Sequence, residues 1–117
     1  MSVDVLFAGV PVTDLRKTVP WYESLFGRAP DIVPNDQEVM WKVVDAGWLY
    51  VVEDAPRAGR ALVTLCFPDL DDAIARVRER GLLPGPVEPV GDAGRKAVLT
   101  DPDGNSVSMI EVTGASA

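Results

Sequence analysis

The chain has 117 residues, 47% of them hydrophobic, with 18 acidic against 11 basic residues and a net charge of −7. This charge repels phosphate backbones and anionic lipid, so we expect no nucleic acid and no membrane among the partners. Histidine is absent, which excludes Ser–His and Cys–His nucleophilic sites.

The remaining bulk properties indicate one domain in a reducing compartment. No apolar run approaches the ~20 residues that span a bilayer. The first residues carry no basic segment before an apolar stretch, so a secretory signal is not expected. Cys66 is the only cysteine and cannot form an internal disulfide. We therefore expect a cytoplasmic protein.

The first half predicts a strand, a helix and three more strands. A β-branched run over residues 3–12 predicts the opening strand. The helix is expected to follow a cap at Asp14 and to end at Gly27. Pro20 predicts either a kink or a helix that begins only at Thr18. The three later strands are expected at 31–33, 39–45 and 48–53.

The second half repeats this order. A strand over 61–67 precedes the clearest helix, which Asp69 caps and Gly81 ends. Three prolines then predict a short edge strand. The chain is expected to close with a hairpin whose strands cover 95–100 and 106–112, joined by Asp101-Pro102-Asp103-Gly104-Asn105.

The two halves share a pattern. Val12-Thr13-Asp14-Leu15 is answered 55 residues later by Phe67-Pro68-Asp69-Leu70, and each half ends on an apolar strand finished by Glu. Repetition at this period indicates two copies of one supersecondary unit that bury their apolar faces together. We therefore predict an α+β fold of two tandem βαβββ modules, 3–53 and 61–112, joined by a linker at 54–60. Together they would form a curved sheet around a cleft within one domain, 1–117.

These residues resemble the vicinal oxygen chelate superfamily, which includes glyoxalase I, extradiol dioxygenases and bleomycin-resistance proteins. The resemblance covers essentially the whole chain. It is carried by Val12-Thr13-Asp14-Leu15 with Trp21-Tyr22 and Leu25-Phe26-Gly27, by the helix over 69–81, and by Asp101-Pro102-Asp103-Gly104-Asn105 before the last strand.

The resemblance implies four positions at which metal-dependent members carry His or Glu ligands. Counting from the shared motifs places them at Phe7, Tyr50, Leu62 and Ser108, with Val51 in place of Tyr50 if the register slips by one. None of these side chains is a competent ligand for a divalent metal. We therefore expect no metal and no other cofactor.

Strand alternation indicates what replaces the metal. If Tyr50 faces the cleft, Trp48 does too, and Phe7 with Trp41 completes an aromatic wall. We predict a ligand-binding cleft lined by Phe7, Trp41, Trp48, Tyr50, Leu62 and Ser108. Aromatic rings can hold a planar or a cationic ligand. The alternative is that these rings simply fill the cleft.

These residues favour a metal-independent protein that binds a small organic ligand, as bleomycin-resistance proteins sequester a drug. By resemblance, a homodimer and a role like antibiotic resistance are expected. The alternative is a lyase or isomerase of the glyoxalase or dioxygenase type. No catalytic residue can be assigned, although Tyr50, Lys42 and Glu53 are acid–base candidates for an enzyme that works without metal.

Four other signals have ordinary structural interpretations. Cys66 is expected to be buried in the core. Lys42 is interpreted as an edge-strand lysine that opposes aggregation. Glu53 and Glu111 are interpreted as solvated rim residues. The Asp101–Asn105 motif lacks the glycine and glutamate of a calcium loop, so a hairpin turn is expected.

Overall fold

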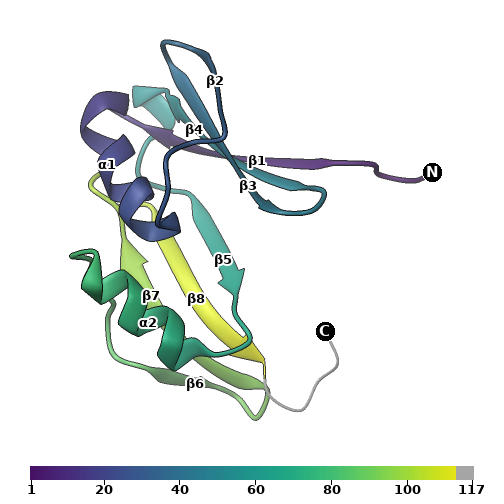
Figure 1. The fold of residues 1–117 in the computed structure, drawn as a ribbon, viewed down its shortest axis with the longest axis vertical. Coiled ribbons are helices and arrows are strands. Elements are labelled where there is room, and N and C mark those ends of the chain that lie inside the picture. Colours follow the sequence, from purple (N-terminus) through teal and green to yellow (C-terminus); the bar gives the residue numbers. More distant parts are fainter. Residues whose placement is uncertain (113–117) are drawn as a thin grey trace.

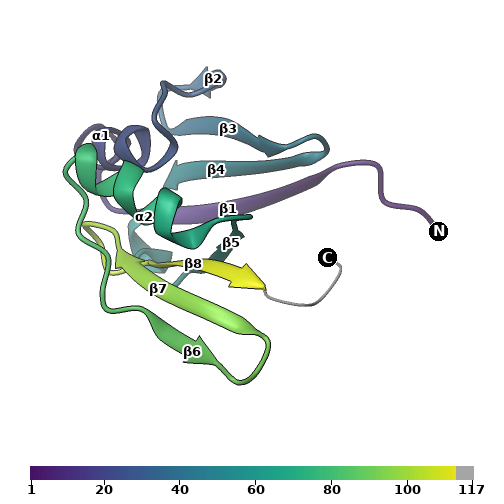
Figure 2. The same cartoon turned by 60° about the horizontal axis from the view of Figure 1, so that its bottom comes forward.

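The structure, a computed structural model, describes residues 1–112 and contains two four-stranded sheets with one helix on each (Figures 1 and 2). In spatial order, sheet A comprises β1 (Leu6–Val12), β4 (Gly47–Glu53), β3 (Glu38–Val44) and β2 (Ile32–Asn35). Sheet B comprises β5 (Leu62–Cys66), β8 (Ser106–Val112), β7 (Gly94–Thr100) and β6 (Glu88–Val90). The helices are α1 (Leu15–Phe26) and α2 (Leu70–Glu79), and a 3₁₀ turn, η1 (Ala55–Arg57), lies between the halves.

Both sheets have the same topology. β1 pairs with β4 in parallel and β5 pairs with β8 in parallel, whereas the remaining neighbours are antiparallel. A parallel pair needs a crossover, and α1 and α2 lie in these crossovers. The predicted α+β fold of tandem βαβββ modules is therefore confirmed.

Alternation along the strands gives each sheet one face that packs on its helix. In sheet A, Val10, Leu49 and Val51 are buried against a face of α1 that includes Tyr22 and Leu25. In sheet B, the equivalent inward residues and the buried residues of α2 form the second half of the core: Ala97, Leu99, Val107, Met109, Leu70, Ile74 and Val77. Both helices lie on the left of the molecule in Figure 1, so the opposite face of each sheet carries no helix of residues 1–112.

The opening strand and first helix differ slightly from expectation. β1 begins at Leu6 rather than at residue 3, and α1 begins at Leu15 and runs through Pro20 to Phe26. The side chain of Asp14 accepts from the N–H of Lys17 at 3.3 Å. This cap fixes the start of α1, so the alternative start at Thr18 is wrong.

The terminal glutamates cap the helices. Glu53 Oε1 accepts from the N–H of Leu15 at 3.1 Å, and Glu111 Oε1 accepts from the N–H of Leu70 at 2.9 Å. Each carboxylate satisfies a donor that the first helical turn leaves unpaired and opposes the positive end of the helix dipole. Glu53 is exposed, as interpreted, although its carboxylate is held by the helix; Glu111 is only partly exposed, and its interpretation as a solvated rim residue is wrong.

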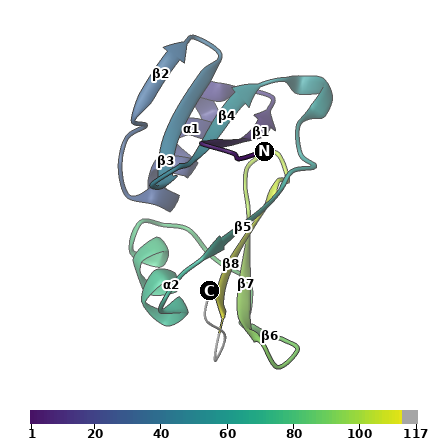
Figure 3. The ribbon, with the colours of Figure 1, turned by 90° about the vertical axis from the view of Figure 1, so that its right-hand side faces the viewer.

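A cluster of polar side chains, with Asp101 and Asn105 buried, connects the modules. Figure 3 shows the turn between β7 and β8 reaching toward the first module. The loop between β7 and β8 places Asp101 beside α1, where it accepts from the Tyr22 hydroxyl. Asn105 donates to the Pro11 carbonyl, and Asp103 accepts from the Thr13 hydroxyl at 2.6 Å. The expected hairpin is present, and its turn also ties module two to module one.

Neither helix in residues 1–112 is long and apolar enough to cross a membrane.

Candidate functional site

The uncovered face of sheet A, called open face A, is a grid of nine residues from three adjacent strands. The pairing register defines its rows as Phe7–Trp48–Lys42, Gly9–Tyr50–Met40 and Pro11–Val52–Glu38. All nine are exposed or half-buried, whereas their neighbours along β3 and β4 are mostly buried against α1. This is the period-two pattern of a sheet with one covered face.

Two aromatic rings of the first row stack on this face. The centroids of Phe7 and Trp48 lie 6.1 Å apart with an interplanar angle of 16°. Phe7 remains 52% exposed, so the pair presents apolar ring surface to solvent. A nearly parallel arrangement matches the shape of a flat aromatic ligand.

Tyr50 extends this surface toward the next row. A Cβ atom built on Gly9 would lie 2.4 Å from Tyr50 Cζ. The tyrosine ring therefore covers β1 at the one position where no side chain occupies that space. Gly9 allows Tyr50 to lie against the strand beside the stacked pair.

Three polar groups of open face A have no hydrogen-bond or ion-pair partner within residues 1–112: Lys42 Nζ, Trp48 Nε1 and the Tyr50 hydroxyl. Lys42 and Trp48 face each other across β3 and β4. β3 lies inside the sheet, between β4 and β2, so the interpretation of Lys42 as an edge-strand residue is wrong. Glu53, another acid–base candidate, accepts a hydrogen bond from the first turn of α1 and is not part of open face A.

Trp41 lies on the other side of sheet A. It is fully buried, packs against Phe26 with centroids 5.3 Å apart, and donates from Nε1 to the Arg28 carbonyl at 3.1 Å. It pairs with core residue Leu49. Since successive residues of a strand face opposite sides, Trp41 cannot share a wall with Lys42. The prediction that Trp41 lines the ligand-binding cleft is therefore wrong.

The uncovered face of sheet B, called open face B, is different in character. Its rows are Leu62–Ser106–Thr100, Thr64–Ser108–Val98 and Cys66–Ile110–Lys96. Leu62 is 86% exposed, and four hydroxyl groups gather beside it. Sequence reasoning named only Leu62 and Ser108, although the Ser106-Val107-Ser108 alternation signals a polar face.

Cys66 lies on open face B and not in the core. It is exposed at the end of edge strand β5. Val63 and Leu65 take the covered positions of this strand, which leaves Cys66 on the outer side. The expectation of a buried cysteine is wrong.

The positions at which superfamily members hold a metal do not fit one in this chain. Phe7 and Leu62 offer only hydrocarbon, and Tyr50 and Ser108 offer neutral hydroxyls. Within residues 1–112, no three His, Cys, Asp or Glu side chains gather in a way that could hold a metal ion.

Beside open face A, Asp31 fixes the end of β3. Its carboxylate accepts from the Lys42 N–H at 2.7 Å and from the guanidinium of Arg28. The hydrogen bond from Arg28, and then that from the Lys42 backbone, lowers the pKa of Asp31 below its usual value. Arg28 and Asp31 thus hold the strand that carries Lys42.

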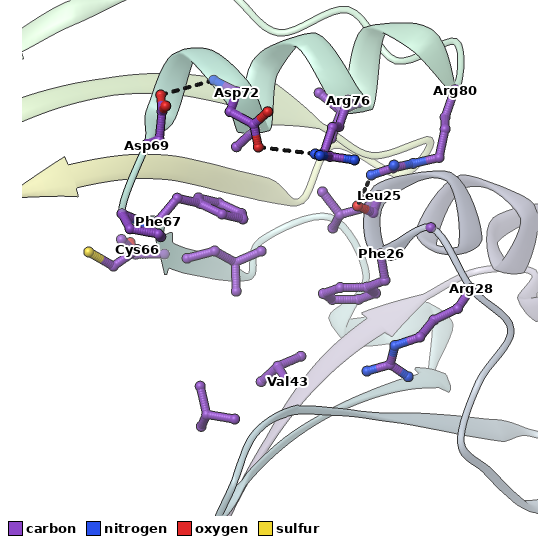
Figure 4. A pocket seen from close by; sticks show the side chains of 17 residues that line it. Leu25, Phe26, Arg28, Val43, Cys66, Phe67, Asp69, Asp72, Arg76 and Arg80 are labelled. Atoms are coloured by element: carbon purple, nitrogen blue, oxygen red, sulfur yellow. Dashed lines mark hydrogen bonds and ion pairs between the residues drawn. The ribbon is translucent and has the colours of Figure 1, made fainter.

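A groove of about 750 Å³ lies between the modules on the helix side (Figure 4). Leu25, Phe26, Val43 and Phe67 form part of its apolar lining. Its three arginines are already occupied: Arg28 pairs with Asp31, Arg76 pairs with Asp72, and Arg80 donates to the last carbonyls of α1. None of the six predicted ligand-binding residues lines this groove. Because its arginines already have partners, we interpret the groove as part of the junction between the modules.

Paired βαβββ modules with open sheet faces define the class of protein, and comparison with known structures identifies its family. A glyoxalase/bleomycin resistance protein from Catenulispora acidiphila is 37% identical, with a TM-score of 0.86 over 92% of this chain and 97% of that one. The chain therefore belongs to the glyoxalase/bleomycin resistance family of the vicinal oxygen chelate superfamily.

Two further structures share the fold at lower identity. TnmS3, an antibiotic-binding protein from a Streptomyces species, is 24% identical, with a TM-score of 0.76 over 97% of this chain and 99% of that one. A bleomycin resistance determinant encoded on transposon Tn5 is 21% identical, with a TM-score of 0.77 over 95% and 99%. No family model matches the sequence, and no curated protein matches it.

Proposed function

We infer that this protein binds a planar organic molecule without metal, and that open face A forms one wall of the binding site. The observation that carries this inference is the half-exposed stack of Phe7 on Trp48, extended by Tyr50 over Gly9. By the resemblance, two of these rings stand at positions where metal-dependent members of the superfamily carry ligands. A flat ligand resting on them would bury ring surface at ~25 cal/mol per Å².

Open face B supports the inference as a second wall. Its hydroxyl groups can donate to or accept from substituents of a ligand whose rings lie on open face A. The names of structural neighbours agree with a binding role, since one is an antibiotic-binding protein and another a bleomycin resistance determinant.

A homodimer is part of the proposal. Leu6, Phe7 and Leu62 are all more than half exposed and lie on β1 and β5, which are edge strands of their sheets. Exposed apolar edge strands favour pairing with another chain. A second copy would cover these edges and bring an open face A opposite an open face B. Sedimentation equilibrium measures the mass directly, and a monomer at micromolar concentration would contradict this part.

The test of binding uses naphthalene-2-carboxamide, a neutral planar probe. Titration calorimetry in the presence of EDTA is expected to show saturable binding, which Phe7→Ser and Tyr50→Ser weaken. Leu83→Ser is the matched control, because Leu83 is exposed but lies outside both open faces. Equal binding by all four proteins would contradict the site, and turnover of the probe would point to an enzyme.

The indole signals supply a second readout. Trp41 Nε1 donates a hydrogen bond to the backbone carbonyl of Arg28, whereas Trp48 Nε1 has no hydrogen-bond partner in the part of the chain described. In a ¹⁵N–¹H spectrum, the probe is expected to shift the Trp48 indole signal and leave that of Trp41 in place. The Trp48→Phe variant assigns the signal. A probe that shifts only the Trp41 signal would place the site elsewhere.

A further inference from the structure

We propose that open face A selects planar aromatic molecules that carry an anionic oxygen, such as a carboxylate or phenolate, and that Lys42 is the residue that sets this preference. The inference rests on the proposed function, because it assigns chemistry to the same wall. It departs from the expectation of a cationic ligand, which the acidic composition of the chain favours.

The first argument is the type of polar group that the wall presents. Lys42 and Trp48 are pure hydrogen-bond donors, and only Tyr50 can also accept. None of these three side chains makes a hydrogen bond or an ion pair within residues 1–112. A ligand that buries them must supply acceptors, because an unpaired buried donor costs more than its hydrogen bond would gain.

The second argument is position. Lys42 and Trp48 are directly opposite each other on the same face of an antiparallel pair. Side chains in such pairs have Cβ atoms only ~5 Å apart. The ammonium group of Lys42 can therefore reach the edge of a ring system stacked on Phe7 and Trp48. A cation on that ring system would meet a like charge.

Glu38, the acidic residue of the same face, lies at the opposite end of β3. It is paired with Val52, two rows away from the Phe7–Trp48 row. Four residues along a strand correspond to ~13 Å, so Glu38 cannot neutralise Lys42 or hold a cation over the stacked rings.

The acidic excess of the chain does not oppose this assignment, because many of the carboxylates are engaged elsewhere. They accept from helix N-termini, from hydroxyl groups of the first module that face the β7–β8 turn, or from arginines: Asp14, Asp69, Glu53, Glu111, Asp101, Asp103, Asp31, Asp54, Asp71 and Asp72. None of these side chains belongs to open face A. Asp31 lies beside it and its charge interacts with that of Lys42, but this carboxylate is already paired with Arg28. The charged side chains of open face A itself are Lys42 and Glu38.

The experiment compares two probes of nearly equal shape, naphthalene-2-carboxylate and naphthalene-2-carboxamidinium, with the neutral carboxamide as reference. At low salt, the carboxylate is expected to bind about tenfold more tightly than the amidinium, as one desolvated charge pair would give. Lys42→Met should remove this preference while leaving carboxamide binding within about twofold. Lys17→Met is the matched control, since Lys17 is exposed on α1, on the far side of sheet A.

Each outcome decides the question. A preference for the carboxylate that disappears in Lys42→Met and persists in Lys17→Met supports the inference. A preference for the amidinium, or a carboxylate preference that survives Lys42→Met, overturns it while the proposed function stands. Failure of all three probes to bind counts against the proposed function itself. Circular dichroism verifies that the variants remain folded.

Discussion

The hydroxyl of Tyr22 donates to Asp101 Oδ2 at 2.8 Å, and both residues are buried. Tyr22 belongs to α1 in the first module, whereas Asp101 begins the turn between the last two strands of the second. Asp101 also accepts from the backbone N–H of Asp103 and from both the backbone and the side chain of Asn105. This carboxylate is therefore the centre of the contact that joins the modules.

Removing the Tyr22 hydroxyl should destabilise the fold. We expect Tyr22→Phe to lower the free energy of unfolding by about 1.5–3 kcal/mol, the range for a hydrogen bond to a charged group. Urea denaturation measures it. Tyr50→Phe is the matched control, because that hydroxyl has no partner in residues 1–112. Equal stability of Tyr22→Phe and the parent protein would contradict a structural role for this contact.

The same contact predicts a loss of stability at alkaline pH. Burial, and then the charge of Asp101, raises the pKa of Tyr22 far above its usual value near 10. Only the unfolded chain releases this proton above pH ~10, so the contribution is complete below that pH and is lost as pH rises. The slope approaches 1.4 kcal/mol per pH unit for one proton. Denaturation between pH 9 and 11 should show a shallower slope in Tyr22→Phe, and identical slopes would refute the assignment.

The two capping glutamates should contribute unequally. Both accept from a helix N-terminus, but Glu111 also pairs with Arg95 at 3.3 Å and is the less exposed. Glu53→Ala should cost about 1 kcal/mol, typical of a lost cap, and Glu111→Ala somewhat more. Thermal unfolding compares the two variants. Neutral effects from both would show that water replaces these carboxylates at no cost.

Gly9→Ala should separate binding from stability. The new methyl group would clash with the end of the Tyr50 side chain, which can rotate away from β1 at small cost. We expect the melting temperature to change by only a few degrees while affinity for a planar probe falls severalfold. Gly85→Ala is the control, because its Cβ would have ordinary contact distances. Unchanged affinity in Gly9→Ala would show that the Tyr50 ring position is unimportant.

The exposure of Cys66 has a simple chemical test. As the only thiol of the chain and an exposed one, it should react with Ellman's reagent in one equivalent without denaturant. At a dilution where the protein is monomeric, the rate should lie within about tenfold of the rate in urea. At higher concentration the proposed dimer, which covers the β5 edge, should slow the reaction. Protection by several orders of magnitude in the monomer would show that Cys66 is buried.

Much of the fold follows from local signals and from the repeat. Asp14 and Asp69 each precede an amphipathic run, and both side chains cap the helices that follow. Tyr50 and Ser108 occupy equivalent positions of the internal repeat, and both lie on uncovered faces. This was predictable because successive residues of a strand face opposite sides whatever packs against the sheet.

Other features depend on contacts that no local pattern contains. Glu53 reaches Leu15 across 38 residues, and an exposed glutamate at a strand end has no signature of that partner. The sequence of β3 alone does not give its register against β4, and packing against Phe26 decides the side of the sheet on which Trp41 lies. Cys66 is exposed because it lies on the uncovered face of β5, an edge strand, and neither the face nor the order of strands is contained in the local sequence.

Phe7, Tyr50, Leu62 and Ser108 project from strands whose alternate residues contribute to the core. Substitution of these outward side chains, one at a time, can therefore change what the protein binds without changing the packing of its core. Along each of these strands, selection for ligand recognition and selection for folding act on alternate residues.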